Sequence, residues 1–222
     1  MDVRIEKIQK RYGKRQILED ISFQTAGGVC IGILGANGCG KSTLFSILAG
    51  VRRADGGSFI CDGADLLTDV KARTRYLGYV PQNTPLLEEL TALDNLRLWY
   101  PKQQLQRELE NGVLKLLGIP EFLKTQVSKM SGGMKKRLAI GCAVSSHPEI
   151  LLMDEPSAAL ELVCKEKIAD YLNDFKKRGG LILLATHDIQ DLTLCDQWYI
   201  LRDGILHPFE YDGDVHKLVG SL

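Results

Sequence analysis

The sequence predicts an α/β fold, in which a mostly parallel β-sheet carries helices on both faces and a helical subdomain is inserted into it. Strand-sized apolar runs alternate with helical segments on both sides of the middle of the chain, and such alternation favours parallel strands. From about Thr91 to Ala143 the pattern is helical throughout. With 222 residues, the chain is long enough for one core and a small appended subdomain.

The first 80 residues contain strand-like segments and one helix. Strands are expected at Val3–Ile8 (by its alternation an edge strand), Ile17–Phe23, Val29–Leu34, Ser58–Cys61 and Tyr76–Val80, and a helix at Ser42–Ala49 that ends at Gly50.

The helical stretch begins at a capping box, in which Thr91 precedes Asp94 by three residues. Apolar residues then recur at helical spacing until Gly118 and Pro120 interrupt the period. A further helix is expected at 135–144, with Lys135, Lys136 and Arg137 on its solvated face.

Strand–helix alternation returns after this stretch. The expected elements are strands at Ile150–Asp154, Leu181–Thr186 and Trp198–Leu201, and helices at Leu160–Phe175 and Ile189–Cys195.

Composition excludes several classes of protein. Lys plus Arg and Asp plus Glu both total 28, so the net charge of zero argues against a general polyanion binder, and we expect no nucleic-acid partner. No apolar run approaches the roughly 20 residues that span a bilayer, and the N-terminus does not resemble a signal peptide. We therefore expect a cytoplasmic protein. The six cysteines lack metal-ligand spacing and are expected to be reduced core residues, apart from Cys39 in a glycine-rich loop.

This glycine-rich loop is the strongest functional signal. Gly35, Gly40, Lys41 and Ser42 fit the pattern G-x-x-x-x-G-K-[ST] between a predicted strand and a predicted helix. Backbone N–H groups of such a loop point at phosphate oxygens, the lysine adds a positive charge, and the serine hydroxyl binds Mg²⁺. The candidate nucleotide ligands are Gly35, Asn37, Gly38, Cys39, Gly40, Lys41, Ser42 and Thr43. The alternative is a glycine-rich turn that binds nothing.

Two adjacent carboxylates end the strand at 150–154. Asp154 is placed to bind Mg²⁺, directly or through water, and Glu155 to face the γ-phosphate and polarise an attacking water. The alternative is a turn with two solvated acids.

A second candidate anion site lies at Ser131-Gly132-Gly133, before the helix at 135–144. Two phosphate-binding helix starts are redundant in a simple kinase. They are useful if the second one caps a nucleotide that another subunit holds.

These motifs, in their order along nearly the whole chain, resemble those of the ATP-binding cassette (ABC) family. Ser131-Gly132-Gly133-Met134-Lys135 is similar to the family signature, and Ser157–Glu161 to the loop that crosses the dimer interface. Tyr12 resembles the aromatic that stacks on adenine, Gln82 the glutamine that senses Mg²⁺ and the γ-phosphate, and His187 the switch histidine. The structural alternatives are a strand-end aromatic for Tyr12, a turn residue for Gln82 and a helix cap for His187.

The resemblance implies a fold and a set of roles. The fold is a RecA-like P-loop NTPase core with an antiparallel β subdomain, at about residues 1–85 and 146–222, and a helical subdomain at about 86–145, within one domain spanning 1–222. The implied catalytic residues are Glu155 as general base, His187 and Gln82. The implied Mg²⁺ site comprises Ser42, Gln82 and Asp154, and ATP is the nucleotide.

The implied function is that of an ATPase subunit which pairs with a second nucleotide-binding subunit, identical or not, and drives a separate integral membrane permease. Met134, where glutamine is usual, resembles a branch that serves exporters of antibiotics, lipids and polysaccharides. Met130 replaces the usual leucine and Glu161 the usual aspartate. The candidate permease contacts are Asn83, Thr84, Pro85, Leu86, Leu87, Trp99 and Tyr100. The rival readings are a non-transport ATPase of the same family and a P-loop phosphotransferase.

Overall fold

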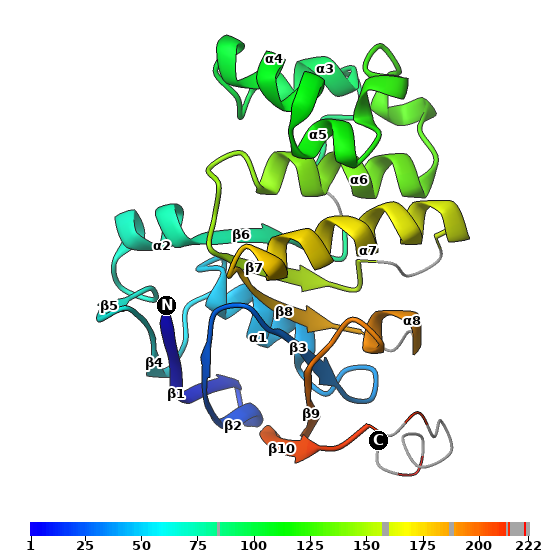
Figure 1. Cartoon of the computed structure of the whole chain (residues 1–222). Helices are drawn as coiled ribbons and strands as arrows, with labels where there is room; N and C mark the ends of the chain where they lie inside the picture. Colours follow the sequence, from blue (N-terminus) through cyan, green and yellow to red (C-terminus); the bar gives the residue numbers. More distant parts are fainter. Residues whose placement is uncertain (84, 157–159, 187–188, 212, 214–219, 221–222) are drawn as a thin grey trace.

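A computed structural model describes the chain except residues 84, 157–159, 187–188, 212, 214–219 and 221–222. Its described strands form one sheet in the order β5-β4-β1-β2-β10-β9-β3-β8-β7-β6 (Figure 1). The described helices lie on both faces of the parallel part of this sheet, as the sequence predicted.

One end of the sheet is antiparallel. It consists of β1 (Asp2–Tyr12), β2 (Arg15–Ala26), β4 (Gly56–Cys61) and the short β5 (Ala64–Asp65). The prediction that the first strand lies at an edge was wrong, because β1 pairs with both β2 and β4. Its alternation reflects a solvent-facing side of an antiparallel sheet rather than an unpaired edge.

The other end is parallel and buried. There β9 (Gln197–Arg202), β3 (Cys30–Leu34), β8 (Leu181–Ala185), β7 (Ile150–Asp154) and β6 (Leu77–Val80) run side by side in parallel. Strand β10 (Ile205–Phe209) pairs with β9 in antiparallel fashion and touches β2 at a single residue pair, which joins the two ends. Every residue of β3, β7 and β8 is buried, as expected of parallel strands that helices cover on both faces.

Alternate residues of these strands enter two separate apolar clusters. Leu151 and Met153 face α6 (Gly132–Ala143) and α7 (Leu162–Lys177). Ile150 and Leu152 face the opposite cluster, which contains the apolar side of α1 (Lys41–Leu48) and residues of β1 and β2. Figure 1 shows α1 and α7 on opposite sides of the sheet.

The inserted helical block stands at the top of Figure 1. It contains α3 (Ala92–Arg97), α4 (Lys102–Asn111), α5 (Val113–Leu116), 3₁₀ turns at Ile119–Phe122 and Val127–Lys129, and α6. The predicted capping box at its start is present, because the Thr91 hydroxyl accepts from the Asp94 N–H at 3.2 Å and donates to the Asp94 carboxylate at 2.6 Å.

Two short helices complete the described fold. The helix α2 (Val70–Tyr76) was not predicted, and α8 (Ile189–Leu192) is shorter than the predicted segment. No helix in the described part of the chain combines the length and the apolar character needed to cross a membrane.

Candidate nucleotide-binding site

A pocket of about 460 Å³ gathers most of the predicted site residues. It lies where β3 and β7 end, which is the usual ligand position in open α/β sheets. Its lining comprises Tyr12, Ile17, Asn37, Gly38, Gly40, Lys41, Ser42, Thr43, Gln82 and Glu155.

The glycine-rich loop has a backbone that demands glycine. The φ angles of Gly35, Gly38 and Gly40 are 152°, 78° and 117°, a region that side chains disfavour. At Gly35 a Cβ would also lie 2.6 Å from the Cys39 Sγ. Cys39 therefore packs against the loop from behind and is absent from the described lining of the pocket.

Lys41 is the first residue of α1 and is buried. Its ammonium donates to the Gly35 carbonyl at 2.6 Å and to the Ala36 carbonyl at 3.3 Å. The positive charge thus lies inside the curl of the loop, where a phosphate oxygen can replace carbonyl oxygens as its partner.

Asp154 is suited to a bound cation. The residue is 2% exposed, and its Oδ1 atom has no hydrogen-bond partner among the described residues. Burial raises the pKa of this carboxyl, while the Ser42 hydroxyl and the Lys41 charge act in the opposite direction. A buried carboxylate oxygen beside a serine hydroxyl fits Mg²⁺, which takes few protein ligands and completes its shell with water and phosphate oxygens.

Glu155 follows directly and has a φ of 51°, unusual for a residue with a side chain. Its N–H donates to the Ala185 carbonyl of β8 at 2.8 Å. Its carboxylate accepts from the Gln82 side-chain amide at 2.8 Å. The structure thus brings together two of the predicted catalytic residues, which are 73 positions apart in sequence. Strained backbone of this kind often marks functional sites.

Tyr12 ends β1 and reaches the pocket with 42% of its surface exposed. The Arg52 guanidinium donates to its hydroxyl at 2.9 Å, and the Lys10 ammonium lies 5.4 Å from its ring centre. The ring is therefore both held in place and open to stacking by a base.

The predicted switch residue His187 lies outside the described residues, so only its surroundings can be given. Just before it, the Thr186 hydroxyl donates to Asp191 at 2.7 Å.

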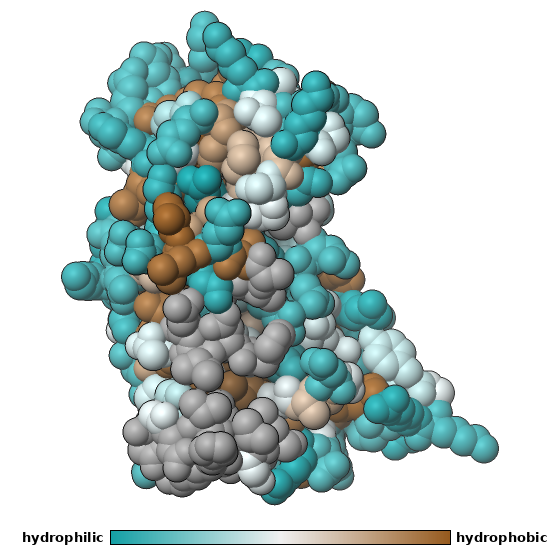
Figure 2. Space-filling view, turned by 90° about the vertical axis from the view of Figure 1, so that its right-hand side faces the viewer, coloured by the Kyte–Doolittle hydropathy of each residue, from teal (hydrophilic) through white to brown (hydrophobic). Residues whose placement is uncertain are grey.

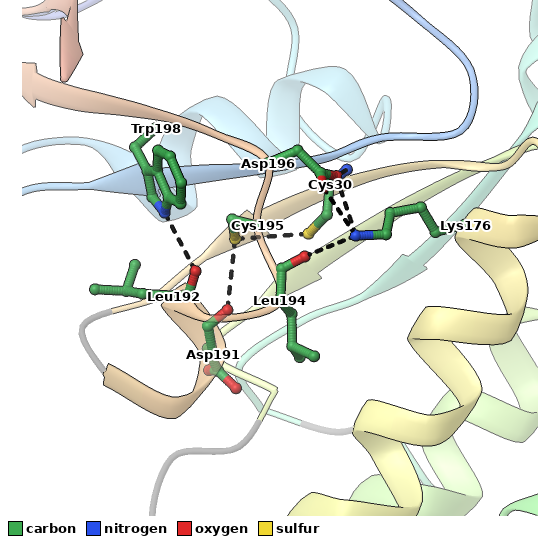
Figure 3. Close-up of polar contacts among 8 residues, drawn as sticks. All are labelled: Cys30, Lys176, Asp191, Leu192, Leu194, Cys195, Asp196 and Trp198. Atoms are coloured by element: carbon green, nitrogen blue, oxygen red, sulfur yellow. Dashed lines mark hydrogen bonds and ion pairs between the residues drawn. The ribbon is translucent and has the colours of Figure 1, made fainter. Parts of the chain in front are cut away.

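Figure 3 shows the polar contacts that hold the segment after α8. Asp196 accepts from Lys176 at 3.0 Å, and the Trp198 indole donates to the Leu192 carbonyl at 3.3 Å.

Ser131, Gly132 and Gly133 do not belong to the described lining of this pocket. Ser131 caps α6, because its hydroxyl accepts from the Met134 N–H at 3.3 Å. Ser131 and Gly132 are exposed, whereas Gly133 is buried against Cys164 of α7. The chain thus presents a second helix start that lies outside the described lining of its own pocket.

Sequence reasoning missed the two basic residues that follow this helix start. Lys136 and Arg137 were expected on a solvated helix face, but both are buried. Lys136 donates to the carbonyls of Pro81 and Gln82, and Arg137 donates to the Leu117 carbonyl. The apolar run that begins at Leu138, directly after them, is the sequence feature that could have indicated their burial.

Comparisons with known proteins establish the family of the chain. The sequence profile described as ABC transporter matches residues 18–158, which is more than half of the chain. The chain belongs to the ABC transporter family. As a member of this family it is an ATP-binding cassette ATPase, which confirms the predicted enzyme class.

Relatives of this ABC protein include both import and export components. It is 31% identical to the probable sulfate/thiosulfate import ATP-binding protein CysA of Chlorella vulgaris, over 92% of this chain and 89% of that protein. It is 32% identical to the linearmycin resistance ATP-binding protein LnrL of Bacillus subtilis (strain 168), over 90% of this chain and 66% of that one. The Nod factor export ATP-binding protein I of Paraburkholderia xenovorans (strain LB400) is 30% identical over 91% and 68%. Several other import relatives are longer, and the chain spans 60–63% of them.

Solved structures give the same fold. A nucleotide-free ATP-binding cassette from an ABC transporter matches with a TM-score of 0.86 over 99% of this chain and 96% of that one, at 22% identity. The dimeric post-hydrolysis structure of the cassette MJ0796, bound to ADP and Pi, matches with a TM-score of 0.83 at 26% identity, over 96% of this chain and 100% of that one. The predicted RecA-like core with its β and helical subdomains is therefore the observed fold.

Proposed function

We propose that this ABC ATPase pairs with a second nucleotide-binding subunit and that the pair encloses two ATP molecules. The pair would drive transport, in the export direction, through a separate membrane permease. The observation that carries the pairing is the position of Ser131–Gly133. This exposed helix start carries phosphate-binding chemistry and yet lies outside the described lining of the chain's own pocket. A head-to-tail partner would supply the missing half of each site.

The chemistry is divided among the pocket residues. The loop from Gly35 to Thr43 binds the phosphates, and Tyr12 stacks on the base. Mg²⁺, held by Ser42, Asp154 and Gln82, would neutralise charge on the β- and γ-phosphates. Glu155, oriented by the Gln82 amide at 2.8 Å, takes a proton from the attacking water. His187 holds the γ-phosphate and the water.

Hydrolysis then works as a switch between two arrangements. The γ-phosphate bridges the two subunits, so its removal takes away the contact that holds the dimer closed. The dimeric post-hydrolysis structure of the MJ0796 cassette, bound to ADP and Pi, supports this assembly for a relative.

An apolar surface beside the crossing loop also supports pairing. The residues at 157–159 lie outside the described part of the chain, but Leu162 and Val163 follow them at the start of α7 and are largely exposed. This end of α7 points to the right in Figure 1 and faces the viewer in Figure 2, where brown surface borders the grey residues.

The permease contact is proposed for the segment after Gln82 and for the helical block. Leu87 and Trp99 are exposed there, and the buried Asn95 amide fixes Leu87 through bonds to its N–H and carbonyl. Tyr100, a predicted contact, is not available to a permease because it is buried and its hydroxyl donates to the Gly141 carbonyl at 2.5 Å. Thr84 lies outside the described residues. Such docking would place the chain on the cytoplasmic face of the membrane.

The proposed export direction is based on Met134 and on the resemblance of the chain to exporters. The relatives of the chain include both importers and exporters. Direction and substrate would be set by the permease.

The test is steady-state ATP hydrolysis by the purified chain as a function of its concentration, with Glu155→Gln as the control. Composite sites predict a rate per subunit that rises with concentration, and loss of that rate in the variant. A rate independent of concentration would contradict the composite sites, and a variant that still turns over would exclude Glu155 as the general base.

A further inference from the structure

Lys136 is a charged residue in an unusual place. It lies in the second turn of α6, the helix that Ser131 caps, and it is only 6% exposed. A buried ammonium is unfavourable unless hydrogen bonds and nearby negative charge compensate its lost hydration. The position therefore calls for a specific set of partners.

The first partners are backbone carbonyls of another segment. The Lys136 ammonium donates to the Pro81 carbonyl and to the Gln82 carbonyl, in both cases at 3.2 Å. These residues follow β6 and are more than 50 positions away in sequence. One side chain thus fastens the backbone around Gln82 to the body of α6.

Acidic side chains provide the second compensation. Burial lowers the pKa of Lys136, and the charges of Asp154, Glu155 and Asp191 oppose this effect. The ammonium thus lies in the field of the two carboxylates that end β7. Lys41 also faces Asp154, from the phosphate loop.

Gln82 continues the connection to the candidate general base. Its backbone carbonyl accepts from Lys136, while its side-chain amide donates to Glu155 at 2.8 Å. The chain of contacts therefore runs from α6 through Lys136 to the Gln82 backbone, and from the Gln82 side chain to the Glu155 carboxylate.

We propose that Lys136 is a positioning residue for ATP hydrolysis, which anchors Gln82 to the helix begun by Ser131 and thereby orients Glu155. The inference rests on the proposed function of this site. Lys136 itself does not line the described pocket, so it acts through Gln82 and not on the nucleotide. Lys136 also connects two groups with different proposed roles. The helix start at Ser131 would bind the partner's nucleotide, and Glu155 would act on the nucleotide bound by its own chain.

Lys136→Met tests this, since methionine keeps most of the apolar stem and removes the donor. We expect kcat to fall by about tenfold, the equivalent of one charged hydrogen bond, with little change in ATP affinity. Lys136→Arg, which keeps charge and donors, should recover part of the rate. The matched control is Lys167→Met on α7, which removes an ion pair with Glu121 at 2.8 Å outside the site and should retain the parental rate.

A double-mutant cycle separates positioning from general stabilisation. In a Gln82→Ala background, Lys136→Met should cause little further loss, because the Gln82 side-chain amide through which it acts on Glu155 is already absent. If Lys136→Met does not fold, Lys136→Gln takes its place in the cycle.

The outcomes are distinct. Unchanged kcat in Lys136→Met, a parallel loss of ATP affinity, or full additivity with Gln82→Ala would overturn the proposal. A parent protein without Glu155-dependent hydrolysis would instead contradict the proposed function.

Discussion

Asp154 is an aspartate whose carboxylate the surrounding protein groups satisfy only in part. Its Oδ1 atom is buried without a hydrogen-bond partner among the described residues, and burial raises the pKa of the carboxyl. A folded-state pKa above the unfolded one means that the charged form is less favourable in the folded protein, so the aspartate lowers stability at neutral pH. A bound cation would reverse this cost.

Asp154→Asn should therefore stabilise the nucleotide-free protein while removing its activity. We expect the melting temperature to rise by about 2–4 °C, which corresponds to roughly 1 kcal/mol in a chain of this size. Mg²⁺-dependent ATP hydrolysis and the extra stabilisation by Mg²⁺ with ATP should both be lost. Thermal melts with and without the ligands measure both effects, with Asp170→Asn on exposed α7 surface as the control. A variant that melts lower than the parent without nucleotide would contradict the argument.

Among single residues, the sequence predicted those whose chemistry follows from a local pattern. The loop glycines, Lys41 and the Asp154–Glu155 pair are of this kind, because spacing and a strand end are visible in one short segment. The hydrogen bond between Gln82 and Glu155 joins two such segments and could be expected only through the family resemblance. Lys136 was misjudged because its partners are backbone carbonyls, which have no sequence signature.

At the scale of elements, the start of α6 contains two glycines with different constraints. Among the described residues, a Cβ on Gly132 would meet only Leu160, at 3.9 Å, whereas a Cβ on Gly133 would overlap the Cys164 Sγ. Gly133 is thus required for the packing of α6 on α7. Gly132 lies on the exposed side, where the partner's nucleotide is proposed to bind.

Gly132→Ala and Gly133→Ala should consequently fail in different ways. Gly133→Ala should lose about 1–3 kcal/mol of stability through overpacking, and Cys164→Ala in the same chain should restore part of it. Gly132→Ala should melt at or above the parental temperature, since alanine favours a helix, and yet lose ATPase activity. Denaturant unfolding and ATPase assays on both variants provide the comparison. Equal destabilisation by the two substitutions would refute the assignment of separate roles.

Elements with a clear apolar pattern were predicted well, and those without one were not. The strands β3, β7 and β8 are continuous apolar runs because both faces are covered, and their limits agree closely with the structure. The helix α2 was missed because it has no buried residue and hence no apolar stripe. The position of β1 between β2 and β4 depends on pairing across the sheet, which its own alternation does not encode.

For the whole molecule, the proposed function implies that one chain presents two separate surfaces to nucleotides. One is the pocket at the ends of the parallel strands, and the other is the exposed cap of α6. One apolar cluster, which contains residues of α6, α7 and the parallel strands, connects these two surfaces. On this proposal, a complete site requires a second copy or a related subunit, which contributes its own α6 cap.

Leu162 provides a test of this assembly. It is 60% exposed at the start of α7, directly after the segment that resembles the interface-crossing loop. A charge there should leave the monomer folded and able to bind ATP, because the side chain contributes little to the core. It should weaken the paired state, because a charge would have to be buried in the interface.

We therefore expect Leu162→Glu to prevent ATP-dependent dimerisation in the Glu155→Gln background, as measured by size-exclusion chromatography with ATP. Val70→Glu is the matched control, since Val70 is an equally exposed apolar residue, at 60%, on α2. ATP affinity should be unchanged in both variants, and only Leu162→Glu should remain monomeric. Dimers of Leu162→Glu as stable as those of Val70→Glu would exclude the start of α7 from the interface, and the paired arrangement would then have to use another face.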